Sequence, residues 1–269
     1  MPSRSGLPLL VALAMITTAC SRVPKPPDAP LAAAPRGDRP LPPADAPLVT
    51  AAPLAPTGRI EGVVRYVGSA PLRVKQLTNN IDVATCGERI VLQTVLLGRE
   101  GAVANVFVEL RREDDSPVMP RATADTSTLG VAIRHCAIEP HVLVVPAGAS
   151  LEIRNEDGLL HYLVAPALRN EPFEARLPRY RKRLRLADSA LRRPEIISVS
   201  CDIHPWEVGW WIVTDNPLRA LTGPDGRFVL EGVPAGTWRL LAWHEDLHRV
   251  EINVTVADGE SVGAELQYR

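Results

Sequence analysis

A cysteine and a histidine three residues apart could bind one metal ion together. Cys201 and His204 follow the β-like run 196–200, so the cysteine falls at a strand end and the histidine in the next loop. Such a pair can reach one ion without distorting the backbone, and thiolate with imidazole suits copper or zinc better than magnesium or calcium. Two side chains do not make a site, so the chain must supply further ligands and a fold that encloses them.

The N-terminus has the pattern of an export signal. Arg4 precedes a short apolar segment at 7–16, and small residues at 17–19 precede Cys20. The apolar segment is too short to span a bilayer as a stable helix. We therefore expect residues 1–19 to be a signal peptide that sends the protein to the bacterial cell envelope.

The segment after the signal predicts a tether. Ala19-Cys20 resembles the cleavage site of bacterial lipoproteins, in which the cysteine becomes the lipid-bearing N-terminus. Thr17 stands where that motif usually has leucine, so cleavage without lipidation is the alternative. Pro and Ala dominate residues 20–57, which have too little apolar bulk to offset their ordering entropy. We expect a linker that ties a periplasmic or outer-membrane lipoprotein to the membrane through Cys20.

Composition limits the partners of the rest of the chain, which is long enough for one large or two small β domains. The formal net charge of -1 argues against a nucleic-acid partner, because proteins that bind nucleic acid are basic. One basic stretch runs over 176–193. It predicts either a solvated strand face, with Leu184 and Leu186 turned inward, or a surface that docks an acidic protein or anionic lipid.

Cysteine usage fits an exported protein. Besides Cys20, the chain contains Cys86, Cys136 and Cys201, and an oxidising compartment favours disulfides. These three cysteines cannot all pair with one another, so one is left over. The sequence alone allows the pairs 86–136, 86–201 and 136–201.

The chain from Gly58 onward predicts an all-β protein. Apolar and polar residues alternate over 58–67, which is the period of a half-buried strand. Further strand patterns cover 90–97, 103–110, 141–145, 151–154, 196–200, 210–213, 222–230, 232–243, 250–256 and 262–268. No segment combines a cap, a helical apolar period and adequate length, and 186–191 is only a short helix candidate.

The C-terminal turns and strands resemble the carboxypeptidase regulatory-like family of small Ig-type or prealbumin-like β-sandwiches. The matching sequences are PDGRF at 224–228 and VPAGT at 233–237. The family also has strands like 58–63 and 105–110, which here lie far upstream. The resemblance therefore implies a sandwich whose strands come from distant parts of the chain.

We expect this sandwich to be split. Residues 58–112 and 215–269 would form it, and 113–214 would be an insert between its strands. An insertion at a loop tip is well tolerated when its ends lie close together. Two sequential domains are the alternative, and a lack of pairing between 58–66 and 225–256 would rule the split out.

Within the insert, HVLVVPAGASLEIRN at 141–155 resembles the cupredoxin family. There, a strand, a turn and a strand ending in Asn lead to the first copper-binding histidine, a position that falls on His161. The second half of a cupredoxin site is Cys-x2-His, which matches Cys201 and His204. The resemblance implies a Greek-key sandwich, with room for roughly two or three strands between His161 and Cys201.

The sequence departs from the family at Glu207. Plastocyanin-like exported bacterial proteins with a His-Pro-Trp-Met loop carry the axial methionine there. A carboxylate is harder and anionic, so we expect it to favour Cu(II) and lower the reduction potential. Alternatively, Glu207 turns to solvent and leaves three ligands, or metal binding is lost. If Cys201 is a ligand, the disulfide must join Cys86 to Cys136.

The neighbouring aromatic and histidine residues have plainer interpretations. We expect Trp206, Trp210 and Trp211 to pack around the loop rather than to form an electron-entry patch. His135 and His141 flank a cysteine and suggest a second metal site, but we expect none where that cysteine is in a disulfide.

The sequence HEDLH at 244–248 matches the zinc-protease motif, in which a helix places both histidines on one face. Here it lies between the strands expected at 232–243 and 250–256. A short turn between strands does not give helical geometry. We therefore expect no protease, no other enzyme activity and no small-molecule substrate.

The sequence as a whole predicts an exported, lipid-anchored, cupredoxin-like copper protein that transfers electrons to or from a redox partner protein. The metal ligands would be His161, Cys201, His204 and Glu207. We expect His204, as the ligand in the loop, to be the exposed edge that faces the partner. The alternative is a metal-free adhesion or scaffold module of the cell envelope, favoured by the Ig-like host and by Glu207.

Overall fold

The computed structural model describes residues 57–69, 75–92, 94–119, 128–187 and 190–269. The expected signal peptide, Cys20 and nearly all of the expected linker lie outside the described residues. The chain divides into compact units at 1–51 and 52–269, and every described residue belongs to the second. Among the described residues, no helix has the length and apolar character that a membrane span requires.

The described chain is almost entirely β, as the sequence predicts. Helical structure is limited to one turn of α-helix, α1 (Val83–Cys86), and one 3-10 turn, η1 (Arg99–Gly101). The short helix candidate at 186–191 is not helical in its described residues. The strands form two sandwiches, each with its own buried apolar core.

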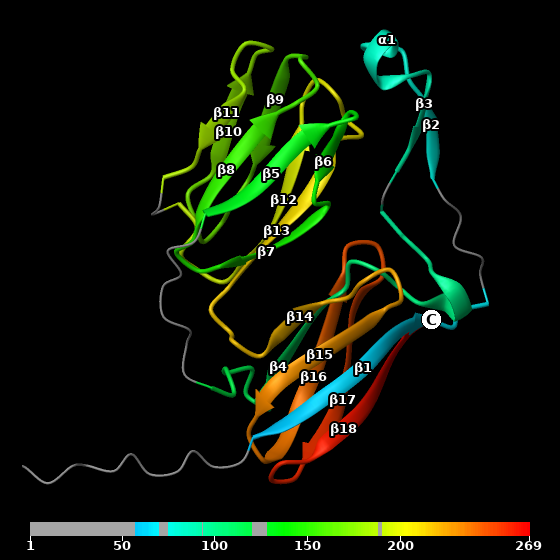
Figure 1. The fold of residues 1–269 in the computed structure, drawn as a ribbon, viewed down its shortest axis with the longest axis vertical. Helices are drawn as coiled ribbons and strands as arrows, with labels where there is room; N and C mark the ends of the chain where they lie inside the picture. Colours follow the sequence, from blue (N-terminus) through cyan, green and yellow to red (C-terminus); the bar gives the residue numbers. More distant parts are fainter. Residues whose placement is uncertain (1–56, 70–74, 93, 120–127, 188–189) are drawn as a thin grey trace, which may run out of the picture. The chain divides into compact units, whose positions relative to one another are not determined.

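The first sandwich contains a three-stranded and a four-stranded sheet (Figure 1). The three-stranded sheet has the order β15 (Arg227–Val233), β1 (Gly58–Tyr66) and β18 (Ser261–Tyr268). The four-stranded sheet has the order β14 (Arg219–Leu221), β4 (Phe107–Arg111), β16 (Gly236–His244) and β17 (His248–Val256). Their shared core includes Ile60, Leu110, Leu230, Leu240 and Leu266.

Strand pairing in this sandwich joins distant parts of the sequence. β1 pairs antiparallel with β15, from Gly58 opposite Val233 to Val63 opposite Arg227, and pairs parallel with β18. β4 pairs with both β14 and β16. Residues 58–66 and 225–256 are therefore paired. A lack of this pairing would have ruled the split sandwich out. The family of this sandwich and its exact boundaries stay predictions.

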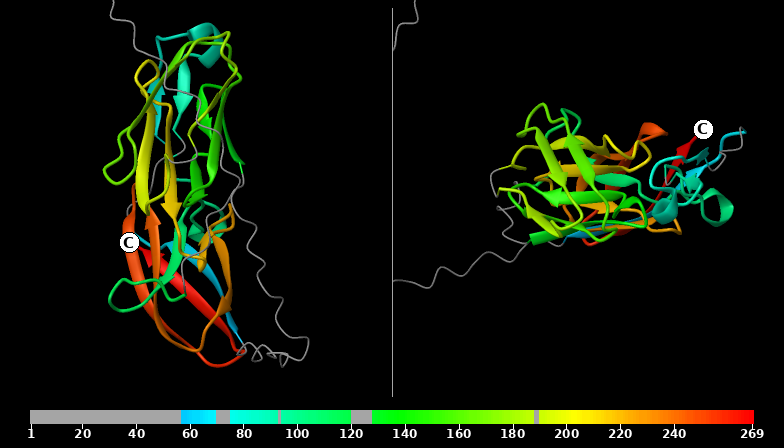
Figure 2. Two further views of the ribbon diagram at one scale, coloured as in Figure 1. Left: turned by 90° about the vertical axis from the view of Figure 1, so that its left-hand side faces the viewer. Right: turned by 90° about the horizontal axis from the view of Figure 1, so that it is seen from above.

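The second sandwich lies between β4 and β14 in the sequence. Its five-stranded sheet has the order β10 (Phe173–Leu177), β9 (His161–Ala165), β12 (Glu195–Cys201), β13 (Val208–Thr214) and β7 (Val142–Pro146). Its four-stranded sheet has the order β11 (Arg183–Arg185), β8 (Ser150–Asn155), β5 (Thr128–Arg134) and β6 (Ala137–Glu139). The two sheets form the layers of the sandwich (Figure 2) and enclose Ile153, Leu163 and Val199.

The strand–turn–strand pattern expected at 141–155 is present as β7 and β8. Gly148, in the turn between them, has a φ of 92°, a conformation that glycine adopts without steric cost. β8 ends at Asn155, whose buried side chain donates to the carbonyl oxygens of Leu159 and Leu177. This side chain therefore fixes the loop that leads to His161.

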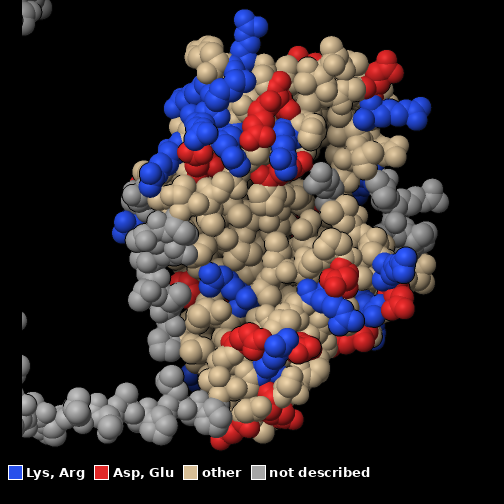
Figure 3. Space-filling view, viewed as in Figure 1, with Lys and Arg blue, Asp and Glu red and all other residues tan. Residues whose placement is uncertain are grey.

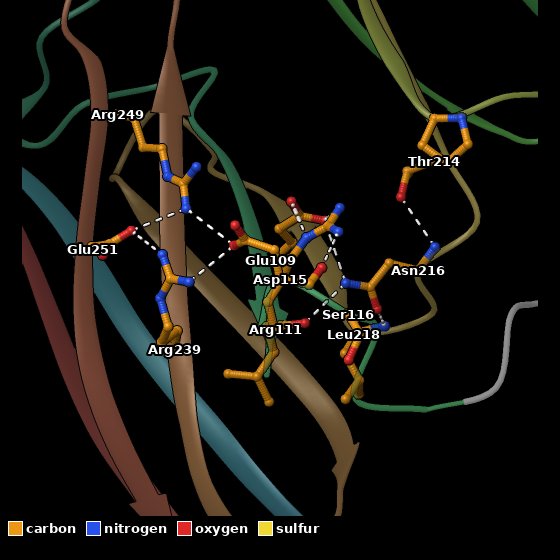
Figure 4. Close-up of polar contacts among 12 residues, drawn as sticks. Glu109, Arg111, Asp115, Ser116, Thr214, Asn216, Leu218, Arg239, Arg249 and Glu251 are labelled. Carbon is orange, nitrogen blue, oxygen red and sulfur yellow. Dashed lines mark hydrogen bonds and ion pairs between the residues drawn. The ribbon is translucent and has the colours of Figure 1, made fainter. Parts of the chain in front are cut away.

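Asn216 secures the return of the chain from the second sandwich to the first (Figure 4). Its fully buried side chain donates to the carbonyl oxygen of Leu110 at 2.9 Å and accepts from the backbone N–H of Leu218 at 3.0 Å. Its own N–H donates to Oγ1 of Thr214, the last residue of β13, at 3.1 Å. The side chain and the backbone N–H of this one residue together tie β13 to the strand β4.

The segment between β1 and β4 differs from the expected strand over 90–97. Within its described residues, this region forms a single three-residue strand, β3 (Arg89–Val91), which pairs with β2 (Gln76–Thr78). α1 lies between these two strands, and its last residue, Cys86, is bonded to Cys136 of the second sandwich. The sequence predicts that residues 75–92 belong to the first sandwich, with the rest of 58–112. The disulfide instead bonds this segment to the second sandwich.

The basic stretch lies at the surface of the second sandwich. Arg176 on β10 and Arg183 and Arg185 on β11 are exposed, whereas Leu184 is half-buried and Leu186 is buried. Figure 3 shows Lys and Arg side chains gathered over this part of the molecule. This is the arrangement of a solvated strand face, and a docking role for it stays a prediction.

Candidate metal centre

Strand register brings Cys201 and His161 to the same face of the five-stranded sheet. Cys201, at the end of β12, is paired with Leu163 of β9. His161 precedes Leu163 by two residues, and residues two apart on a strand point to the same face. His161 begins β9 and Cys201 ends β12, and two strands, β10 and β11, lie between these two in the sequence, in line with the two or three strands expected.

The hairpin of β12 and β13 adds Glu207 and His204. The N–H of Cys201 donates to the carbonyl oxygen of Glu207 at 3.1 Å, so these two residues are opposite each other and share a face. The loop between them is closed by a turn, in which the N–H of Glu207 donates to the carbonyl oxygen of His204 at 2.9 Å. The turn folds His204 back over the end of the hairpin.

The four predicted ligands meet at one point. Their ligand atoms all lie within 4.8 Å of one another. The Sγ atom of Cys201 is 3.6 Å from Nδ1 of His204 and 4.0 Å from Nδ1 of His161. Glu207 places Oε2 at 2.9 Å from Nδ1 of His161 and Oε1 at 3.4 Å from Nδ1 of His204. Cys201 is 1% exposed and the other three residues are fully buried.

Glu207 points into the site rather than to solvent, so the three-ligand alternative in which it turns outward is wrong. Its Oε1 atom is buried without a hydrogen-bond partner among the described residues. A buried carboxylate oxygen that accepts no hydrogen bond carries a desolvation cost. A cation bound among the four ligand atoms would remove that cost, so the donor set fits a metal ion.

The site also shifts the ionisation of His161. Burial lowers its pKa, but hydrogen bonds to Cys201 and Glu207 outweigh burial and raise the pKa from 6.5 to about 9. In the metal-free protein, His161 is therefore positively charged at neutral pH, with a proton on each of its two ring nitrogens. A metal ion must displace the proton on Nδ1 to bind that atom.

The expectation that His204 is an exposed edge is wrong. His204 is fully buried, and its outer nitrogen, Nε2, lies 3.0 Å from Oδ2 of Asp82. Asp82 belongs to the segment that the disulfide ties to the second sandwich. No local pattern in the sequence singles out this aspartate, and the only nearby signal is Cys86, four residues later.

The cysteines are arranged as the cupredoxin resemblance implies. Of the three pairs that the sequence allows, Cys86–Cys136 is the disulfide, with an S–S distance of 1.97 Å. Cys201 is left as a free, buried cysteine. The predicted lipidation at Cys20 lies outside the described residues.

The tryptophans near the loop pack as predicted. Trp206 is buried, its ring centroid is 5.3 Å from that of His204, and its Nε1 donates to the carbonyl oxygen of Cys136 at 3.1 Å. Trp211 is buried in the core of the second sandwich. Trp210 is half-buried, and its ring contacts that of Trp243 at a centroid distance of 5.3 Å.

The HEDLH sequence forms a turn between β16 and β17, and His244 is paired with His248 across it. The helical geometry of a zinc protease is therefore absent. Glu245 is instead buried, where it accepts hydrogen bonds from Nε2 of His141 and from Nε1 of Trp210, the latter at 2.5 Å. The other nitrogen of His141 contacts the carbonyl oxygen of Val208 at 3.1 Å, so both of its ring nitrogens are engaged.

No protein-family model and no curated protein matches the chain. One similar solved structure is a Cu-containing nitrite reductase from Thermus scotoductus SA-01, with 26% identity, a TM-score of 0.29, and coverage of 36% of this chain and 25% of the reductase. A purple cupredoxin from Nitrosopumilus maritimus has 18% identity and a TM-score of 0.27, over 34% of this chain and 100% of the cupredoxin. Oxidised plastocyanin from Dryopteris crassirhizoma has 13% identity and a TM-score of 0.27, over 32% of this chain and 100% of the plastocyanin.

This chain thus spans a quarter of the reductase that it matches. Each of the three likenesses covers little more than a third of this chain or less.

Proposed function

We propose that the second sandwich is a cupredoxin-like, copper-binding domain that transfers electrons and carries a carboxylate where a thioether is usual. One observation carries the proposal. A thiol, two imidazole nitrogens and a carboxylate lie within 4.8 Å of one another, and all four residues are buried. Thiolate and imidazole together select copper or zinc among the common biological metals. Copper bound by these residues would supply one-electron redox chemistry.

The residues of the site are held in ways that suit electron transfer. Cys201 ends β12, which pairs with β9 and β13, and His161 begins β9. Glu207 directly precedes β13, and its carbonyl oxygen accepts from the N–H of Cys201. Ligands on paired strands cannot move far, so little structural rearrangement accompanies a change of charge at the site. The negative charge of Glu207 favours the more highly charged oxidation state and a low reduction potential.

The same burial supports a role other than catalysis. Catalytic metal sites keep a coordination position open for water or substrate, whereas closed sites use four protein ligands. Here four donors converge and none of them is exposed by more than 1%. A small substrate would find no free position, which supports the expectation that the protein is not an enzyme.

A closed structural zinc site is the second candidate, because zinc accepts a tetrahedral set of cysteine, histidine and carboxylate ligands. Full burial of Glu207, a harder ligand than methionine, favours this candidate. A metal-free scaffold module is supported less well, since it would leave Oε1 of Glu207 buried without a hydrogen bond among the described residues.

We propose in addition that 58–112 and 215–269 form a carboxypeptidase regulatory-like sandwich into which 113–214 is inserted. The pairing of β1 with β15 supports this division. The signal at 1–19 and a lipid on Cys20 would place the protein in the bacterial cell envelope as a periplasmic or outer-membrane lipoprotein. A redox partner protein in the same compartment would then exchange electrons with it.

Metal content tests the proposal. The full-length protein is recovered from its own cell envelope, and bound metals are measured by mass spectrometry. About one copper per chain supports the copper domain, and about one zinc supports the structural alternative. Protein that contains neither metal, and that takes up neither on incubation, contradicts both.

A further inference from the structure

The segment 75–92, here called the cover, has a rigid loop at its tip. Asn79 is buried, and its Nδ2 donates to the carbonyl oxygens of Ile81 and Gly87, both at 2.8 Å. Its Oδ1 accepts from the N–H of Ile81 at 2.8 Å. Asp82 follows with a φ of 47°, a left-handed conformation that aspartate tolerates better than most residues. The position of Asp82 is therefore set by the loop itself.

The cover is anchored beside the metal centre by the bond between Cys86 and Cys136. Cys136 is fixed in turn, because its carbonyl oxygen accepts from Nε1 of Trp206 at 3.1 Å and its N–H donates to Oδ2 of Asp157 at 2.9 Å. The same Oδ2 atom is 4.0 Å from Nε2 of His161. Cys136 of the disulfide thus contacts two side chains, Asp157 and Trp206, that lie next to ligands of the site.

Asp82 contacts the site directly. Its Oδ2 atom lies 3.0 Å from Nε2 of His204, a fully buried ring, whereas the side chain of Asp82 is 43% exposed. A carboxylate on the outer nitrogen of a metal-binding histidine fixes the orientation of the ring and the nitrogen that holds the proton. Here this contact leaves Nδ1 of His204 directed at Sγ of Cys201, 3.6 Å away.

We propose that Asp82 is a positioning residue for His204 and that the cover controls how fast metal enters and leaves the site. The inference rests on the proposed metal site. It goes beyond that site because neither the ligand set nor the strand register requires a fifth residue from a distant segment. When the contact between Asp82 and His204 breaks, the cover opens about its disulfide anchor and exposes the ring and the thiol beneath it.

Three variants of the full-length protein separate this role from simpler effects. Asp82→Gly removes the carboxylate without backbone strain, because glycine adopts left-handed conformations freely. Asp82→Asn also tolerates this conformation and keeps an oxygen that accepts from His204. Glu88→Gly is the matched control, since it removes one charge and adds flexibility in the same cover, at an exposed side chain. Circular dichroism checks that each variant folds.

Two rates are then measured. In protein loaded with Cu(II), release of the metal to excess EDTA should be about tenfold faster for Asp82→Gly, since loss of such an outer partner costs on the order of 10–100-fold in metal affinity. In metal-free protein, alkylation of Cys201 by iodoacetamide, followed by peptide mass spectrometry, should speed up by about the same factor. Asp82→Asn should stay within about threefold of the wild type in both assays. Glu88→Gly should match the wild type.

The two assays keep this inference separable from the proposed function. If the wild-type protein takes up no Cu(II), the proposed function fails, and the alkylation of Cys201 alone decides whether the cover protects the site. Equal alkylation rates for Asp82→Gly and Glu88→Gly would overturn the inference. So would an Asp82→Asn variant as fast as Asp82→Gly, because the hydrogen bond to His204 would then play no part.

Discussion

Cys201 and Glu207 are directly opposite each other across the hairpin of β12 and β13, joined by a hydrogen bond of 3.1 Å from the N–H of Cys201 to the carbonyl oxygen of Glu207. Cross-strand partners project to the same face of a sheet. The hairpin therefore points the thiol and the carboxylate at the same two imidazoles. The register of the hairpin, continued one residue beyond the start of β13, brings Glu207 into the site.

Replacing Glu207 by methionine should raise the reduction potential of the copper-loaded protein. The substitution removes a buried negative charge that favours Cu(II) and supplies a soft thioether instead. We expect a rise of at least about 60 mV, which is a tenfold change in the equilibrium of a one-electron couple. Redox titration measures it, with Glu156→Met, which alters an exposed carboxylate of the same sandwich, as the control. Equal potentials for the two variants would show that Glu207 does not act on the metal.

The metal-free protein should lose stability as the pH rises through about 9. The pKa of His161 is higher in the folded protein than its ordinary value of 6.5. The protonated ring thus stabilises the folded state fully below pH 6.5, and this contribution disappears as the pH passes about 9. It amounts to about 3 kcal/mol. Urea unfolding at several pH values measures it, and His161→Gln should remove this part of the pH dependence. An unchanged pH dependence in that variant would contradict the assignment.

Copper affinity should increase with pH. Because His161 holds a proton below its pKa of about 9, each metal ion that binds must release that proton. We expect the apparent affinity to rise by at least about tenfold for each pH unit between about 7 and 9, because the thiol that binds the metal gives up its proton as well. Competition with a chelator of known pH dependence measures this slope. A flat profile would show that the metal does not displace the proton on His161.

Glu245→Ala should destabilise the protein by about 2 kcal/mol, because it leaves the ring nitrogens of the buried His141 and the half-buried Trp210 without their acceptor. Chemical unfolding measures the loss. The exposed side chain of Glu113 provides a control, and Glu113→Ala should change stability by less than about 0.5 kcal/mol. The unaltered protein should show no zinc-dependent peptidase activity. Such activity, abolished by Glu245→Gln, would contradict the structural role of HEDLH.

The sequence predicts most strands from local patterns, whereas the four residues that meet at the site are those that the resemblance to the cupredoxin family implies. Alternation with period two marks β1 and the strands β15–β18. The spacing of Cys201 and His204 marks the loop, and the strand–turn–strand pattern before Asn155 indicates where to look for His161. Strand patterns are properties of short segments, so no knowledge of distant contacts is needed to predict the strands.

What the sequence does not predict is the surroundings of His204. The contact with Asp82 joins residues 122 positions apart and depends on a loop that Asn79 and the disulfide hold in place. A strand pattern over 90–97 is misleading there, since most of that segment forms no regular sheet. A loop ligand is also expected to be exposed, whereas His204 is fully buried and contacts Asp82 of the distant cover. Contacts of this kind leave no periodic signal.

Cu(II) titration of the purified, metal-free protein tests the central claim most directly. If Cys201 binds copper together with His161 and His204, an intense thiolate-to-copper absorption band should grow and saturate at about one Cu(II) per chain. The band should be absent in Cys201→Ser and strongly reduced in His161→Ala, while circular dichroism shows that both variants keep their β structure. A wild-type protein that develops no such band, or a band that survives in Cys201→Ser, would contradict the proposed metal centre.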